Sequence, residues 1–395
     1  MEPNTHSIKQ FNNLEVAFAP RSDKELKKMH LIFSAMNNST LVNLGIKLTN
    51  FAIKIHFPIK WIMKKTMFGH FCGGETIQEC TDSVNQLGEY QVKGILDYSV
   101  EGSGTEESFE LTKNEVLQTI KIGSGNKNIP FAVFKMTGLG DYELMTKIQE
   151  GKSLSKEEET AFQNLKNRVD AICQLAHDTG TRLLIDAEDS WYQDTLDEIV
   201  YEAMAKYNKE RCVVFNTFQM YRHDMFQRLK RAHQAAKQKG HFFGAKLVRG
   251  AYMEKERERA AQLGYPSPIQ TDKASTDRDY DAALEYCVKN IDTMNLFSGS
   301  HNEKSNLYLA ELINNYGLQK DDERIYFSQL YGMSDNISFN LANEGYNVVK
   351  YVPYGPVEKV MPYLSRRAEE NTSIAGQSSR ELELIKKEIQ RRKIG

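Results

Sequence analysis

The sequence predicts an α/β protein built as a distorted (βα)8 TIM barrel with an N-terminal helical extension. Three observations support this prediction. From about residue 91 onward, short apolar runs alternate with amphipathic helical stretches, the runs number eight, and each turns polar at its C-terminal end. Apolar strands separated by helices indicate a parallel sheet, because parallel strands need a crossover connection. Eight βα units are the number found in a TIM barrel.

The predicted strands fall within eight runs along the chain. In order, these are VKGILDYSVEG (92–102), IPFAVFKMTG (129–138), TRLLIDAED (181–189), CVVFNTFQMY (212–221), FFGAKLVRGAY (242–252), NLFSGSHN (295–302), RIYFSQLYG (324–332) and NVVKYVPYG (347–355). Helices are predicted between them, most clearly over 196–208, 224–240 and 302–317. An open, doubly wound sheet is the main competing fold, but it seldom uses eight consecutive repeats.

Polar side chains stand at the C-terminal ends of all eight runs. They are Asp97, Glu101, Lys135, Asp186, Glu188, Gln219, Tyr221, Lys246, Arg249, His301, Asn302, Gln329 and Tyr351. In a TIM barrel these ends meet at one mouth, where the active site lies. One such residue would be an ordinary strand end, but eight sets in register are hard to explain by packing. The pattern therefore predicts an enzyme.

The segment after the eighth run (357–373), which includes MPYLSRRAEENTS (361–373), carries two faces at helical spacing. The apolar face holds Val357, Val360, Met361, Leu364 and Ala368, and the polar face holds Tyr363, Arg366, Arg367 and Glu370. An isolated polar face of this kind is most simply a solvated Arg366–Glu370 pair. Two adjacent arginines also suit a small carboxylate, which planar guanidinium groups bind bidentately. Because the helix follows the eighth strand directly, we favour the carboxylate clamp.

Composition and motifs exclude several function classes. The net charge of −2 gives no electrostatic case for nucleic acid, so no nucleic-acid partner is expected. The five cysteines form no CxxC pair, which fits a reducing compartment and argues against a zinc site. The contexts GSGTEE, GSGNKN and GLGDYE lack the third glycine of a dinucleotide fingerprint. His301, Asp186 and Glu188 could hold a metal by residue type but lack ligand spacing, so we expect no metal.

The sequence predicts three parts: a helical extension (1–88), the barrel (89–375) and a charged, solvated C-terminal helix (376–395). The polar N-terminus MEPNTHSIKQFNN has no apolar core and is poor in arginine, which predicts a cytoplasmic location, with the inner face of the cytoplasmic membrane as an option. The segment 41–71 is apolar with only basic charges. It is either a helical layer over the core or a basic amphipathic surface that makes peripheral contact with an anionic bilayer.

The combined motifs resemble proline dehydrogenase (proline oxidase), in its monofunctional, mitochondrial-type branch. The resemblance rests on YLSRRAEEN, KLVRGAYMEKERERAAQLGYPSPI, DAEDSWYQ, GILDYSVEG, FSQLYG and KYVPYGP and spans about residues 70 to 375. This family consists of flavoenzymes on a distorted TIM barrel. The resemblance implies oxidation of L-proline to Δ1-pyrroline-5-carboxylate, hydride transfer to N5 of FAD, and reoxidation of the flavin by a membrane quinone.

The resemblance also implies roles in substrate binding. Arg366 and Arg367 would bind the proline carboxylate, with Lys135 as a further cation that acts either as a base or only as a charge. Glu370 would hold the arginine pair, and Asp186 would steady the polar groups around the substrate. The pyrrolidine ring would be walled by Tyr252, Leu330, Tyr351 and Tyr363.

For FAD, the resemblance places Gln219 and Lys246 near the isoalloxazine. The rest of the cofactor would be held by Arg249, Gly250, Ala251, His301, Asn302 and Gln329. The bifunctional branch reads RLVKGAY where this chain reads KLVRGAY, so the two cations exchange places. Which of Lys246 and Arg249 contacts the flavin ring and which the phosphates is open at this point.

Two other functions are compatible with the sequence. Hydroxyproline dehydrogenase is the nearest alternative in the same superfamily, where a smaller residue than Tyr351 leaves room for the ring hydroxyl. Tyr351 therefore favours proline. A barrel without activity, used for binding or regulation, is the second alternative. The complete set of polar strand ends and both arginines argue against it.

Overall fold

A computed structural model of the 395-residue chain describes residues 8, 10–38, 40–42, 45, 60–100, 104–364 and 377–394. The chain divides into two compact units. The first unit comprises residues 1–9, 102–328 and 345–347, and the second comprises 10–101, 329–344 and 348–395.

Eight parallel strands carry the fold. They are β1 (Val92–Tyr98), β2 (Phe131–Lys135), β3 (Arg182–Asp186), β4 (Val214–Gln219), β5 (Phe243–Val248), β6 (Met294–Gly299), β7 (Ile325–Leu330) and β8 (Val348–Tyr354). Their order, β1-β8-β7-β6-β5-β4-β3-β2, follows the chain, as in a (βα)8 barrel. Each strand lies inside its predicted run, except that β6 begins one residue earlier, at Met294. This agreement confirms the predicted fold.

Residues Ile325–Ser328 of β7 belong to the first unit, whereas Gln329, Leu330 and all of β8 belong to the second. In the first unit the Phe327 N–H donates to the Asn347 carbonyl at 2.9 Å, and in the second the Tyr331 N–H donates to the Tyr351 carbonyl at 2.8 Å. Within the second unit β1 pairs with β8 along its whole length, from Val92 opposite Val348 onward. The carboxyl ends of successive strands are therefore aligned in each unit.

The helices of the first unit follow strands β1 to β6 along the chain. They are α7 (Glu106–Gly123), α8 (Tyr142–Gln149), α9 (Lys156–Thr179), α10 (Ser190–Tyr207), α11 (Met225–Gln238), α12 (Met253–Leu263), α13 (Lys273–Lys289) and α14 (Glu303–Asn315), with a short 3-10 turn η1 (Met136–Gly138). The predicted helices over 196–208, 224–240 and 302–317 fall on α10, α11 and α14. The termini of α9 show why such segments fold locally: Ser155 and Glu158 form a capping box, and Gly180 ends the helix with φ +73°.

Aromatic side chains pack around Phe131, the first residue of β2. The ring of Phe131 meets the rings of Phe215, Phe297 and Tyr326 edge to face, with centroids 4.8 to 5.6 Å apart. Phe131, Phe215 and Tyr326 are among the first two residues of their strands, so this aromatic core lies toward the amino-terminal ends of β2, β4 and β7.

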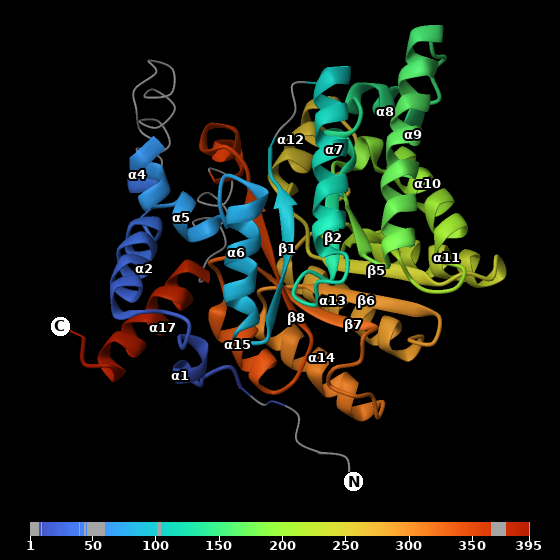
Figure 1. The fold of residues 1–395 in the computed structure, drawn as a ribbon. Coiled ribbons are helices and arrows are strands. Elements are labelled where there is room, and N and C mark those ends of the chain that lie inside the picture. The colour runs from blue at the N-terminus through green and yellow to red at the C-terminus, as the bar shows by residue number, and fades with distance from the viewer. Residues whose placement is uncertain are drawn as a thin grey trace. The chain divides into compact units, whose positions relative to one another are not determined.

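The second unit contains the chain's N-terminal and C-terminal helices. They are α1 (Leu14–Ala17), α2 (Asp23–Met36), α4 (Lys60–Lys65), α5 (Phe68–Phe71), α6 (Ile77–Gly88), α15 (Asp335–Asn343) and α17 (Gln377–Arg391), with a further helix over 357–364. Blue α2 and red α17 come from opposite ends of the chain and lie side by side (Figure 1). Among the helices described here, none is long and apolar enough to cross a membrane.

The C-terminal helix α17 is packed rather than solvated. Leu382, Leu384 and Ile385 join an apolar cluster with residues of α2, α5 and the 357–364 helix. Glu381 is also buried. The prediction that α17 is solvated is therefore wrong. Most side chains of α17 are polar or charged, so the sequence did not reveal its narrow buried face.

Candidate functional site

In the first unit, a buried ion pair joins Asp186, the last residue of β3, to Lys246, which lies two residues before the end of β5. The Lys246 Nζ lies 2.5 Å from Asp186 Oδ1, and the two side chains are 7% and 16% exposed. The strand β4 lies between them in the sheet. In a barrel, alternate strands contribute side chains to the same interior layer, which explains why β3 and β5 meet. The structure thus brings together two residues that the sequence predicted separately.

Lys135 stands directly opposite Asp186 in the β2–β3 register. Beyond these strand ends lies Glu188, whose carboxylate accepts hydrogen bonds from the N–H and the hydroxyl of Thr137. Burial raises the pKa of Glu188, although the Thr137 hydrogen bonds and the charge of Lys135 oppose the rise. Gln219 is buried and donates through Nε2 to the Glu188 carbonyl at 2.7 Å. These side chains form a polar layer next to the Lys246–Asp186 pair.

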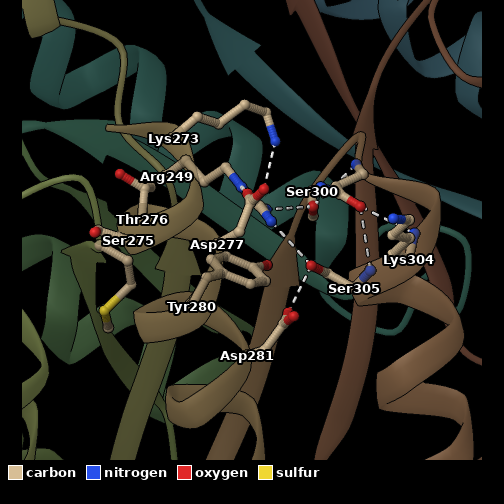
Figure 2. A network of polar contacts seen from close by, with 12 residues as sticks. Arg249, Lys273, Ser275, Thr276, Asp277, Tyr280, Asp281, Ser300, Lys304 and Ser305 are labelled. Carbon is tan, nitrogen blue, oxygen red and sulfur yellow. Dashed lines mark hydrogen bonds and ion pairs between the residues drawn. The ribbon is translucent and has the colours of Figure 1, made fainter. Parts of the chain in front are cut away.

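Arg249, three residues beyond Lys246, points toward a different group of residues (Figure 2). Its Nε donates to Asp277 Oδ1 at 2.7 Å, and its two terminal nitrogens donate to the hydroxyls of Ser300 and Ser305 at 3.0 and 2.9 Å. The guanidinium lies 4.3 Å from the centroid of the Tyr280 ring, in cation–π geometry. Ser305 in turn donates to an oxygen of Asp281 at 2.6 Å. Arg249 is thus fixed among β6, α13 and the start of α14.

The residues that follow Arg249 make an exposed turn. Gly250 has φ +126°, and a Cβ at this position would lie 2.6 Å from the Tyr221 ring. Only glycine allows this close approach of backbone and ring. Ala251 is exposed, Tyr252 is half-buried, and Tyr252 precedes α12. The turn therefore offers accessible backbone beside the fixed Arg249.

The start of α14 carries the next predicted residues. Asn302 caps the helix, and its Oδ1 accepts from the N–H groups of Lys304 and Ser305 at 2.9 and 3.3 Å. His301 precedes it and is half-buried. The position at a helix N-terminus favours negative charge, because the positive end of the helix dipole lies there.

In the second unit, the predicted residues lie on the ends of β7 and β8 and on the 357–364 helix. Gln329 is buried, and its Oε1 accepts from the Ser338 hydroxyl at 2.8 Å. Leu330 is half-buried, and Tyr351 is 6% exposed. The side chain of Tyr363 belongs to the apolar cluster around Val360, although the helical spacing had put it on a separate polar face. Arg366, Arg367 and Glu370 lie outside the described residues.

The sequence interpretation missed several residues that shape these sites. They are Thr137, Asp277, Tyr280, Ser300 and Ser305 in the first unit, and Asp335 and Lys350 in the second. Ser300 and Ser305 flank the predicted His301 and Asn302, so their place after a strand was a usable signal. In the part of the chain that the structure describes, no group of three or more His, Cys, Asp or Glu side chains could hold a metal ion.

Comparison with known proteins identifies the family. The family model for proline dehydrogenase matches residues 80–380. Proline dehydrogenase 1, mitochondrial, of Dictyostelium discoideum is 33% identical over 93% of this chain and 71% of its own length. Hydroxyproline dehydrogenase of Xenopus laevis is 32% identical over 95% of this chain and 88% of its own length.

Solved structures support the fold. The proline utilization A (PutA) protein from Bdellovibrio bacteriovorus, inactivated by N-propargylglycine, superposes with a TM-score of 0.72 at 22% identity. The superposition covers 91% of this chain and 38% of that one, so this chain spans little more than a third of the PutA protein. At this identity the likeness shows the (βα)8 fold and nothing further.

The comparisons also contradict the predicted cellular location and establish the family of the chain. Several curated relatives, the Dictyostelium protein among them, are named as mitochondrial enzymes, which contradicts the predicted cytoplasmic location. That prediction rested only on missing features in a short polar segment, and an absence of signals is weak physical evidence. The family match, by contrast, covers residues 80–380, which include all eight strands. The chain belongs to the proline dehydrogenase family and is an oxidoreductase of that family.

Proposed function

We propose that this chain oxidises L-proline to Δ1-pyrroline-5-carboxylate with FAD as its cofactor. The observation that carries the proposal is the buried Lys246–Asp186 pair in the carboxyl halves of β3 and β5, with Lys135 opposite Asp186. A buried ion pair costs desolvation energy and is weak evidence for stability alone. Its position at the functional end of a (βα)8 barrel instead suits a site that binds a charged substrate beside a cofactor.

The first unit contains donors that fit FAD. Lys246 and Gln219 face the interior layer and would lie near the flavin ring. Arg249 is held at the N-terminus of α14, where negative charge is favoured, so it would serve the phosphates together with His301 and Asn302. Gly250 has no Cβ and both Gly250 and Ala251 are exposed, so the turn supplies accessible backbone groups. In the second unit Gln329 would complete the set. When bound, FAD supplies the redox chemistry by accepting a hydride at N5.

The substrate would be held by its carboxylate and by its ring. We assign the carboxylate to Arg366 and Arg367, with Lys135 as an added cation and Glu370 as the brace of the arginine pair. Paired arginines suit a carboxylate because each offers a planar set of donors. Asp186 would keep Lys246 oriented in the polar layer. The ring would lie against Tyr252, Leu330, Tyr351 and Tyr363.

The product defines which bond is oxidised. Δ1-Pyrroline-5-carboxylate keeps the hydrogen on the carboxylate-bearing carbon, so the hydride leaves the ring CH2 on the other side of the nitrogen. The amine loses one proton as the C=N bond forms, and two electrons leave with the hydride. The protein's part is to bind the carboxylate, hold that CH2 at the flavin and exclude water.

We further propose a quinone as electron acceptor, reached by peripheral contact with a membrane. The helix α4 presents Trp61 and Ile62, which are 65% and 49% exposed. Lys60 and Lys64 pair with Glu75, and Lys65 lies over the Trp61 ring. Exposed aromatic and aliphatic side chains among lysines are typical of a membrane-surface segment.

Flotation with anionic liposomes tests this contact. We expect the protein to float with the vesicles at low salt, and Trp61→Ser with Ile62→Ser to reduce the floated fraction severalfold. The exposed pair Leu111→Ser and Leu263→Ser is the control. Absence of binding by the unmodified protein would overturn the membrane proposal and leave the proline reaction untouched.

The visible spectrum of the purified protein tests the main proposal. We expect flavin absorption that bleaches when L-proline is added without oxygen, and no bleaching with D-proline at the same concentration. A colourless protein that does not take up added FAD would refute the cofactor assignment. A flavin spectrum that L-proline leaves unchanged would refute the substrate.

Hydroxyproline oxidation is the second candidate, because the similarity to hydroxyproline dehydrogenase of Xenopus laevis extends over nearly the whole chain. Tyr351 decides between them, since its buried phenol would fill the space that a ring hydroxyl needs. We expect kcat/KM for L-proline to exceed that for trans-4-hydroxy-L-proline. Tyr351→Ser should lower the ratio of these two kcat/KM values at least tenfold. A preference for hydroxyproline in the unmodified protein would favour the alternative.

A further inference from the structure

The backbone of the loop that follows β7 is held by side chains from three separate segments of the second unit. The His70 ring nitrogen Nε2 lies 2.8 Å from the Gly332 carbonyl, and the Lys350 ammonium donates to the Met333 carbonyl at 2.6 Å. The Ser334 N–H donates to Glu381 Oε1 at 2.5 Å. Every backbone group named here lies within four residues of Leu330, so the course of the chain just beyond Leu330 is determined.

At the end of this loop Asp335 binds two cations. Lys350 donates to Asp335 Oδ1 at 2.7 Å, and Arg21 donates to Oδ2 through Nε and Nη2 at 3.1 and 2.8 Å. The side chains of Lys350, Asp335 and Arg21 are 0%, 2% and 14% exposed. Burial alone would raise the pKa of Asp335, but the two cations hold it well below its ordinary value. The carboxylate is therefore ionised and uses both oxygens.

The backbone of the loop is constrained as well as held. Gly332 has φ +76°, and a Cβ there would lie 2.3 Å from the His70 carbonyl oxygen. Ser334 adopts φ +51°, which costs free energy for a residue other than glycine. Such conformations persist where the surroundings over-determine them, and they cluster at functional sites. Here the surroundings are His70, Glu381 and the Asp335 ion pairs.

The constrained loop adjoins two residues that we assign to the ring of the substrate. Leu330 precedes it directly, and the Tyr331 N–H donates to the Tyr351 carbonyl at 2.8 Å. Lys350 and Tyr351 are neighbours on β8, so their side chains point to opposite faces of the strand. Lys350 thus ties the outer face of β8 to the loop, while Tyr351 occupies the other face.

We propose that Arg21, Asp335 and Lys350 are positioning residues that set the placement of Leu330 and Tyr351 for the substrate ring. The proposal rests on the proline reaction proposed above. It makes the N-terminal segment, through Arg21, and the C-terminal helix α17, through Glu381, parts of the machinery that shapes the substrate pocket. None of the three residues touches substrate in this assignment, so none is a catalytic residue.

Steady-state kinetics of Lys350→Met, Lys350→Arg and Arg21→Gln test the proposal, with the exposed Lys24→Met as control. Each variant is first assayed for bound FAD by its spectrum, and only the flavin-loaded protein is compared. We expect Lys350→Met to raise the KM for L-proline at least tenfold and to change the ratio of kcat/KM between L-proline and trans-4-hydroxy-L-proline at least fivefold. Lys350→Arg should recover most of both effects, because it keeps the cation.

A purely structural role predicts something different. Lys350→Met would then lower the melting temperature and the yield of loaded protein but leave KM and the substrate ratio of the loaded fraction unchanged, which would overturn the proposal. If Lys350→Met does not fold, Arg21→Gln decides the question by the same criteria, since Arg21 is the most exposed of the three. If the unmodified protein does not oxidise L-proline at all, the proposed function fails first and this inference fails with it.

Discussion

Asp186 and Lys246 form a salt bridge of 2.5 Å across the intervening strand β4, at the carboxyl end of the sheet. Lys246 is almost fully buried, so its ammonium depends on negative charge supplied by the protein. The pair fixes the orientation of two polar side chains that would otherwise have several rotamers. Removal of the Asp186 charge should therefore destabilise the protein.

Asp186→Asn should destabilise the protein by about 3 kcal/mol and lower the rate of flavin reduction by L-proline. The amide removes the negative charge beside a buried ammonium while keeping the size of the side chain. Urea unfolding and anaerobic stopped-flow absorbance measure the two effects. Asp292→Asn is the matched control, because Asp292 is 95% exposed. A loss of stability no larger than that of Asp292→Asn would contradict the prediction.

Arg249→Lys should weaken FAD binding about tenfold. Lysine keeps the charge but cannot reach Asp277, Ser300 and Ser305 together, nor stack on the Tyr280 ring, so the start of α14 would lose its fixed cation. Titration of the apoprotein with FAD, followed by flavin fluorescence, gives the dissociation constant. Arg231→Lys on the exposed face of α11 serves as control. Superimposable titrations of Arg249→Lys and the unmodified protein would rule out the phosphate assignment.

Arg366→Met should raise the KM for L-proline by about 10- to 100-fold, as expected from loss of one or two charge-assisted hydrogen bonds to a carboxylate. The flavin spectrum should persist, since Arg366 is assigned to substrate and not to FAD. Initial rates over a range of L-proline concentrations provide the test. The exposed Arg278→Met supplies the comparison. An unaffected KM would remove the arginine clamp from the proposed function.

The sequence predicted the elements of the sheet well because the signals are local. Each strand shows as an apolar run, and the polar residues that follow it show where its carboxyl end lies. Asp186 and Lys246 were both found in this way. That they form a pair could not be deduced from the runs alone, since the contact depends on the layering of alternate strands.

Contacts between distant parts of the chain explain what the sequence did not reveal. Lys350 lies in an otherwise apolar run, and its partner Asp335 stands 15 residues away, in a segment with no strand-end signal. Arg21 is separated from Asp335 by 314 residues. The burial of α17 escaped notice because most of its surface is charged, whereas its buried face is narrow. Only packing brings these groups together.

Glu381 gives a prediction about pH. Burial, with the nearby charge of Asp335, raises the pKa of Glu381 from 4.5 to about 7, although the Ser334 N–H and Lys350 oppose the rise. The folded protein therefore binds a proton between these two pH values that the unfolded chain has lost. Stability from this group is present at low pH and is lost as the pH rises through about 7.

Glu381→Gln should remove this dependence, because glutamine does not ionise and its carbonyl can still accept from the Ser334 N–H. The free energy of unfolding of Glu381→Gln, relative to the unmodified protein, should rise by about 2 kcal/mol between about pH 5.5 and about pH 8.5. Urea unfolding at both pH values measures the difference. The exposed Glu383→Gln, on the same helix, should show no such rise, since Glu383 pairs with Lys387 at the surface and has a lowered pKa. Parallel stability curves for Glu381→Gln and the unmodified protein would mean that Glu381 is ionised throughout this range and that the Ser334 N–H and Lys350 outweigh its burial.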